Sequence, residues 1–124
     1  MSTKARPILF SGLMVRAILE GKKRQTRRVL KKQPHPEAEL RAIIPRPNAV
    51  GSCAYFAHID AKGIHNHDLA VYCPYGMPGD RLWVLGASRI MLEITGVWVK
   101  RSQKREREKD QWFWVVEFCR VEKP

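Results

Sequence analysis

The chain has 124 residues, 44% of them hydrophobic, which is enough for one packed domain over residues 1–124 and too few for two. Twenty-three lysines and arginines against twelve acidic residues give a formal net charge of +11, which favours a polyanionic partner, most often a nucleic acid. No apolar run is long enough to span a membrane and no signal peptide pattern opens the sequence. We therefore expect a cytoplasmic monomer without a membrane partner.

The first predicted elements are a short strand and an amphipathic helix. Residues 7–10 form an apolar run that is typical of a strand. Ser11 is a candidate N-cap, the apolar side chains of residues 14–19 recur at helical spacing, and Gly21 supplies a C-terminal stop.

Prolines dominate the next part of the chain. Positions 34, 36, 45 and 47 are all proline, so residues 33–52 are expected to form a proline-rich loop. Any helix around residues 37–44 would have to be short.

From residue 53 onward the patterns indicate strands. Apolar and aromatic runs alternate with turns, and Pro78-Gly79 suits the central positions of a type II turn within residues 74–80. The predicted strands are residues 53–59, 69–73, 81–85, 90–95 and 112–121. One early helix followed by many short strands predicts an α+β fold built on a small, strongly curved sheet or barrel.

Positive charge is concentrated in two blocks. Residues 22–32 hold seven cations and no acid, and residues 100–109 hold six cations and two glutamates. The first block lies between apolar segments, so folding would fix its geometry. The second belongs to a charged loop expected at residues 100–111, whose contacts with phosphate would be salt-sensitive and independent of base sequence. The expected nucleic-acid-binding residues are Lys22, Lys23, Arg24, Arg27, Arg28, Lys100 and Arg101.

Lys23 and Thr26 are candidate catalytic residues. Amide hydrolysis needs a group that activates the nucleophile and donors that stabilise the oxyanion. A lysine can serve as the base where burial and neighbouring cations weaken its hold on the proton. The two side chains would converge in a turn or bulge, whereas on a strand they would point to opposite faces. The alternative interpretation is a solvated cationic surface with Thr26 as an ordinary strand residue.

The order of several motifs resembles the ASCH domain family, a relative of the PUA fold. Gly21-x-Lys23-x-x-x-x-Arg28 looks like the GxKxxxxR signature of that family. Further segments resemble ASCH-like proteins of bacteriophages and prophages, and these are residues 6–12, 14–19, 25–29, 73–76, 78–84, 88–90 and 114–118. The resemblance covers the two ends of the chain and weakens between residues 33 and 70.

The resemblance implies a small PUA-like β-barrel of mixed short strands, a cleft beside the first helix, and a role related to RNA or nucleotides. Some small ASCH members are amidohydrolases that deacetylate N4-acetylcytidine, and others are implicated in cleaving RNA. Lys23 and Thr26 match the lysine and threonine that serve catalysis in the amidohydrolases, together with a carboxylate farther along. We expect no cofactor and no metal.

Two segments are shorter than their counterparts in ASCH-like proteins. Residues 85–87 take the place of an acidic, aromatic segment, and residues 100–110 take the place of an acidic helix. Both shortenings remove cleft wall and the matching carboxylate. Glu93, Glu106 or Glu117 would have to replace that carboxylate.

The cysteines and histidines raise two further questions. Cys53, Cys73 and Cys119 are odd in number and form no CxxC pair, which predicts reduced thiols acting as small core residues. Together with His58 and the histidines at positions 65 and 67, Cys53 and Cys73 offer zinc-ligand types, but the spacings match none of the usual paired patterns.

Three functional hypotheses follow. The first is a domain that binds RNA, a nucleotide or a nucleoside through the basic segment at residues 21–28. The second is a small hydrolase acting on N4-acylated cytidine or on RNA, with Lys23 as base and Thr26 as nucleophile or orienting residue. The third is a degenerate phage product that folds but has no ligand. Binding should survive Lys23→Ala with a modest loss, whereas catalysis should vanish.

Overall fold

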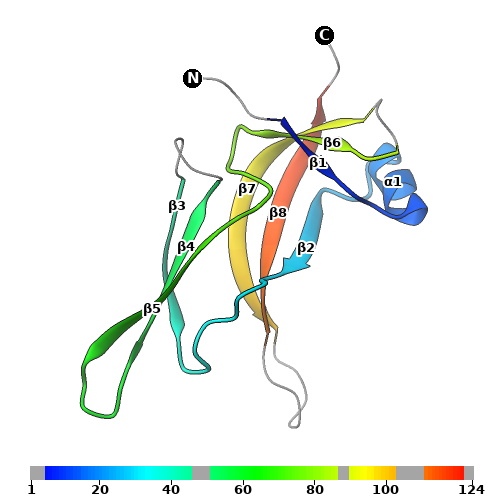
Figure 1. The fold of residues 1–124 in the computed structure, drawn as a ribbon. Coiled ribbons are helices and arrows are strands. Elements are labelled where there is room, and N and C mark those ends of the chain that lie inside the picture. Colours follow the sequence, from blue (N-terminus) through cyan, green and yellow to red (C-terminus); the bar gives the residue numbers. More distant parts are fainter. Residues whose placement is uncertain (1–4, 46–50, 87–89, 103–110, 122–124) are drawn as a thin grey trace.

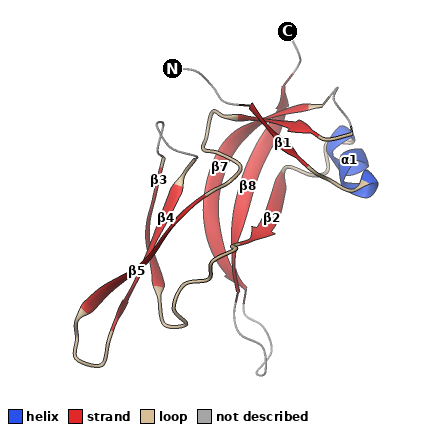
Figure 2. Cartoon of the chain, in the orientation of Figure 1, coloured by secondary structure: helices blue, strands red, loops and turns tan. Residues whose placement is uncertain are grey.

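The computed structural model consists of two β-sheets and one short helix (Figures 1 and 2). It describes residues 5–45, 51–86, 90–102 and 111–121. The elements are β1 (Ala5–Ile8), α1 (Gly12–Leu19), β2 (Gln25–Val29), β3 (Glu39–Ile44), β4 (Cys53–Ile59), β5 (His65–Tyr72), β6 (Arg81–Val84), β7 (Met91–Ser102) and β8 (Gln111–Val121). The predicted α+β class, rich in strands with one early helix, is confirmed.

Helix α1 begins and ends as its sequence predicts. The Ser11 hydroxyl accepts a hydrogen bond from the Met14 amide at 3.3 Å, which satisfies one of the free donors of the first turn. After the last turn, Gly21 adopts a φ of 74°, a left-handed conformation that favours glycine. Ile18 is buried and attaches the helix to the core.

The larger sheet has five strands in the order β1-β6-β7-β8-β2. β1 is parallel to β6, and the other neighbouring pairs are antiparallel. β7 and β8 are the two long, curved strands in Figure 1. β2 pairs only with β8 among the described strands, so it forms one edge of this sheet.

β7 extends farther than the sequence predicts. It continues past residue 95 to Ser102, because residues 97–102 pair in register with β8. Lys100 and Arg101 therefore lie on a strand, and the prediction that residues 100–111 form a charged loop is wrong for its first three residues and for Gln111. The remainder of that loop, residues 103–110, lies outside the described residues.

The smaller sheet contains β3, β4 and β5 in that order. The expectation that residues 33–52 form a loop, with any helix confined to residues 37–44, is wrong there, because Glu39–Ile44 is a strand. The prolines flank this stretch and none lies inside it, so all six residues can pair with β4 or face solvent as a sheet edge.

The two sheets contribute to one hydrophobic core. Phe56 of β4 contacts Trp112 of β8 with ring centroids 5.0 Å apart, and both belong to the same packed cluster. Trp114, Val116 and Phe118 alternate along β8 and are buried in this cluster. Among the described strands no hydrogen-bonded ladder joins the two sheets into a closed barrel.

A turn before β6 is attached to β1 by an ion pair. Gly79 has a φ of 97°, which agrees with the expected type II turn at Pro78-Gly79. The Asp80 carboxylate accepts hydrogen bonds from the Arg6 guanidinium at 3.0 Å and from the Met77 amide at 3.2 Å. Across the described ranges, no helix has both the length and the apolar character needed to cross a membrane.

Candidate nucleic-acid interface

β2 carries Arg27 and Arg28 of the basic segment and presents them on opposite faces of the sheet. Successive side chains of a strand point to opposite sides. Thr26 and Arg28 pair with Val116 and Trp114, which face the core, and Thr26 is only 2% exposed. Arg27 lies on the opposite face and is exposed. The strand thus separates the arginines at positions 27 and 28 although they are neighbours in sequence.

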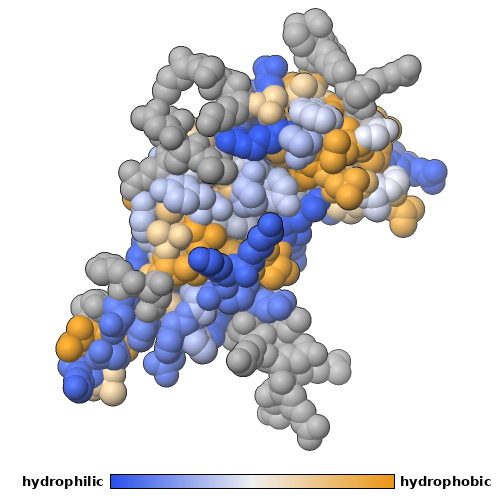
Figure 3. Space-filling model, in the orientation of Figure 1, coloured by the Kyte–Doolittle hydropathy of each residue, from blue (hydrophilic) through white to orange (hydrophobic). Residues whose placement is uncertain are grey.

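An open cleft of about 590 Å³ lies beside the start of α1, and we call it the α1 cleft. Its walls combine apolar side chains, hydroxyl groups and two arginines. They are formed by Leu9, Phe10, Ser11, Met14, Thr26, Arg27 and Arg28. In Figure 3 the surface over the α1 end of the molecule mixes hydrophobic with hydrophilic residues. In this part of the chain, Leu9 is 66% exposed, a high value for a leucine that lines a cleft.

Arg28 is held on the wall of the α1 cleft by four groups. Its Nε donates a hydrogen bond to the Thr26 hydroxyl at 3.2 Å, and its Nη2 donates to the Leu9 carbonyl at 2.9 Å. The rings of Phe10 and Tyr75 lie 5.4 and 5.6 Å from its Cζ, within the range of cation–π attraction. The burial of Thr26 is thereby explained, because its hydroxyl orients the arginine.

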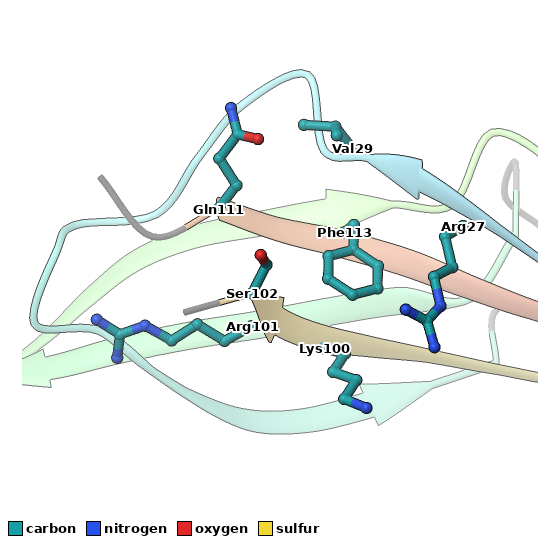
Figure 4. Close-up of a pocket in the computed structure, with 7 residues that line it drawn as sticks. All are labelled: Arg27, Val29, Lys100, Arg101, Ser102, Gln111 and Phe113. Atoms are coloured by element: carbon teal, nitrogen blue, oxygen red, sulfur yellow. The ribbon is translucent and has the colours of Figure 1, made fainter. Parts of the chain in front are cut away.

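A second concavity, which we call the basic hollow, lies on the other face of β2. It has a volume of about 450 Å³ and is shown in Figure 4. Figure 4 shows Arg27 of β2 and Lys100 of β7 beside the Phe113 ring, whereas the side chain of Arg101 extends away from it. The lining residues are Arg27, Val29, Lys100, Arg101, Ser102, Gln111 and Phe113. Among these described lining residues three are basic and none is acidic.

Strand pairing explains why two basic blocks distant in sequence meet here. β8 lies between β2 and β7, and Phe113 of β8 pairs with Val29 on one side and Lys100 on the other. Paired residues share a face of the sheet. Arg27 lies two residues from Val29, so it stands on the same face as Lys100.

The arginines of the basic hollow are positioned by aromatic and carbonyl groups. The Cζ of Arg27 lies 5.5 Å from the centre of the Phe113 ring. The Arg101 guanidinium lies 6.0 Å from the Trp112 ring and donates a hydrogen bond to the Pro36 carbonyl at 3.2 Å. These contacts reduce the freedom of both side chains.

Lys23 lines a third concavity, which we call the Lys23 hollow. Its volume is about 540 Å³, and it also holds Arg24, Thr95 and Glu117. The Thr95 hydroxyl donates a hydrogen bond to the Glu117 carboxylate at 3.4 Å, and β7 has a register shift at this threonine. Thr26 is not among the residues that line this hollow. The candidate catalytic pair, Lys23 and Thr26, therefore lines two different concavities.

The structure divides the predicted binding residues into groups. It brings Arg27 together with Lys100 and Arg101, and it places Arg24 with Lys23. Lys22 is exposed and forms an ion pair with Glu20 at 3.1 Å, so it lies apart from these concavities. Of the three candidate carboxylates, Glu117 lines the Lys23 hollow, Glu93 pairs with Arg81 and Cys119 across neighbouring strands, and Glu106 lies outside the described residues.

Several contributing residues were missed by sequence reasoning. Phe113, Phe10 and Tyr75 position arginines, yet each reads in sequence as an ordinary core aromatic. Nothing in the sequence indicates that Thr95 lines a candidate site, because it reads only as one residue of an alternating strand. The pairing of β2 with β8, and of β8 with β7, identifies Phe113 and Thr95, whereas Phe10 and Tyr75 are identified by their contacts with Arg28 in the folded protein.

The zinc-ligand candidates are separated and have other contacts. Cys53 and Cys73 are buried free thiols, and Cys119 is free but exposed, which corrects the expectation that all three are core residues. The His58 ring stacks on the His35 ring at 4.0 Å. In the described part of the chain, no group of three or more histidine, cysteine or acidic side chains could hold a metal ion. The side chains at positions 65 and 67 lie outside it.

Comparison of the chain with protein-family models, with curated proteins and with solved structures finds no match. The resemblance to the ASCH family therefore rests on sequence motifs alone. The function has to be argued from the geometry of the three concavities.

Proposed function

We propose that the protein binds RNA or a nucleotide through β2 and the adjoining ends of β7 and β8. The observation that carries the proposal is the basic hollow, where Arg27 and Lys100 from two different strands meet beside Phe113 and where none of the described lining residues is acidic. The order of the ASCH-like motifs supports the same role, and membership of that family with its PUA-like barrel is part of the proposal.

The charges of the basic hollow fit phosphate groups. Lysine and arginine side chains that neutralise phosphates release condensed counterions, and this release supplies much of the affinity of a nucleic acid complex. Arg27 is held against the Phe113 ring, so less side-chain freedom is lost when a phosphate is bound. A net charge of +11 adds long-range attraction between the protein and any polyanion.

The proposal is tested by fluorescence anisotropy with labelled single-stranded RNA at several salt concentrations. We expect the double variant Arg27→Gln/Lys100→Gln to bind about tenfold more weakly, a loss of ~1.4 kcal/mol. For each lost phosphate contact, the slope of log affinity against log salt should fall by about 0.7. Both side chains are exposed, so folding should be preserved.

Arg41→Gln is the matched control. Arg41 is an exposed arginine of β3, in the other sheet, and it lies outside the basic hollow. Its loss removes one positive charge but no proposed contact. Equal weakening by the control and by Arg27→Gln alone would mean that only net charge matters, and the proposed site would be wrong.

A hydrolase is the second candidate, and the Lys23 hollow favours it. This hollow places an amine, a carboxylate and the hydroxyl of Thr95 together, whereas Thr26 lines the α1 cleft. Lys23 with Glu117 would supply the acid–base chemistry. Release of acetate from N4-acetylcytidine that is lost in both Lys23→Ala and Glu117→Gln would establish this activity. Release that survives either change would exclude these residues from the reaction.

A further inference from the structure

We infer that the α1 cleft takes a single unstacked guanine base, which Arg28 recognises, while the basic hollow binds the flanking phosphates. This inference rests on the proposed function and names the ligand of the cleft that adjoins the basic hollow. It is carried by the way Arg28 is oriented, by the apolar wall of the cleft, and by one arginine that lines both concavities.

The hydrogen bonds of Arg28 leave one edge of the guanidinium for a ligand. An arginine has five N–H donors. Within the described residues, the side edge formed by Nε and Nη2 is used by Thr26 and Leu9. The terminal edge, with Nη1 and the second hydrogen of Nη2, makes no hydrogen bond in these contacts. Two parallel donors at this edge suit a ligand that presents two adjacent acceptors.

The wall of the α1 cleft favours a base over a bare phosphate. Leu9 and Met14 supply apolar side chains, and Leu9 is 66% exposed where it lines the cleft. Phosphate gains nothing from apolar contact, whereas the face of a base does. The volume of about 590 Å³ lies within the range of pockets that hold small ligands.

Arg27 connects the cleft with the basic hollow. Arg27 lines both concavities, because it stands on the exposed face of the edge strand β2 between them. A nucleic acid strand that crosses this edge can place a phosphate beside Arg27 and the adjoining base beside Arg28. The two concavities then act as one site for a short single strand.

Guanine fits the free edge of Arg28 better than adenine. Guanine presents O6 and N7 as adjacent acceptors, and paired donation to these atoms is the commonest specific contact of arginine with a base. Adenine presents an amino donor beside N7, so it would place a donor against one N–H of the arginine. A base must be unstacked to enter the cleft, which single-stranded RNA allows at low cost.

The test is the affinity of the full chain for short labelled uridine oligomers that carry one central guanosine, adenosine, cytidine or 7-deazaguanosine. We expect the guanosine oligomer to bind about tenfold more tightly than the others. The preference should disappear with 7-deazaguanosine, which lacks the N7 acceptor. This comparison uses the unaltered protein and does not depend on the folding of a variant.

Arg28→Lys should abolish the guanosine preference, because a lysine lacks the two parallel N–H donors of the guanidinium. The affinity for plain uridine oligomers should change little, because the lysine keeps the positive charge. Arg41→Lys is the control and should leave the preference intact. Equal binding of all oligomers, a preference for cytidine, or a guanosine preference that survives Arg28→Lys would each overturn the guanine assignment while the proposed function stands. Binding of none of the oligomers would overturn both.

Discussion

Arg28 and Lys22 lie six residues apart in one basic block, yet their surroundings differ completely. Arg28 is oriented by two hydrogen bonds and two aromatic rings, whereas Lys22 is exposed and forms an ion pair with Glu20. A fixed guanidinium can discriminate between ligands, because its donors are already aimed. An exposed lysine contributes mainly to the overall electrostatic field of the protein. At the residue scale, a cation on β2 such as Arg28 is oriented by the fold, whereas a cation before the strand such as Lys22 is not.

The three thiols also differ by position. Burial raises the pKa of Cys73 to about 11, and Cys53 is fully buried as well. The thiolate is the reactive species, so Cys73 should be inert near pH 8 for lack of both access and ionisation. Cys119 is exposed on β8.

We therefore expect a disulfide exchange reagent to modify one thiol in the native protein and all three after unfolding in guanidinium. Cys119→Ser should reduce the native reaction to nothing while the unfolded chain still shows two thiols. Rapid modification of Cys73 in the folded protein would contradict its placement in the core.

At the scale of elements, the sequence predicts best where local chemistry decides the structure. Ser11 and Gly21 mark the two ends of α1 by capping and by a left-handed φ, and both act within a few residues. β3 was missed because the flanking prolines are typical of a loop, although the eight residues between Pro36 and Pro45 contain no proline and six of them form the strand. The length of β7 was missed because its polar end is held by pairing with β8, a partner that local patterns do not reveal.

Two glycines, one in a crowded position and one in an open position, provide a matched test of how the chain packs. A Cβ at Gly51 would lie 2.5 Å from the carbonyl oxygens of Cys73 and Gly76, which are backbone atoms that cannot move aside cheaply. A Cβ at Gly12, in the first turn of α1, would meet nothing within 4 Å.

Gly51→Ala should lower the free energy of unfolding by about 1–3 kcal/mol, the usual cost of overpacking. Gly12→Ala should be neutral or should raise it by up to about 1 kcal/mol, because alanine favours the helix. Guanidinium unfolding of both variants measures the difference. A Gly51→Ala variant as stable as the native protein would show that Gly51 does not pack against the backbone of Cys73 and Gly76.

At the scale of the whole molecule, the order of strands in the larger sheet creates the candidate site. The sequence shows two basic blocks, and its charge predicts a polyanionic partner. It does not show that Arg27 and Lys100 meet, because this depends on β8 lying between β2 and β7. The separation of Lys23 from Thr26 was also hidden, since spacing along the chain alone left convergence and divergence equally open.

The most direct test of the central claim is an NMR titration of the isotope-labelled protein with short single-stranded RNA at low and high salt. The amide signals of Arg27, Lys100 and Phe113 should move together, and the shifts should weaken as salt increases. These residues come from three different strands, so joint movement would establish the basic hollow as the binding surface. Shifts confined to the β3-β4-β5 sheet or to the Lys23 hollow, or no shifts at all, would contradict the claim.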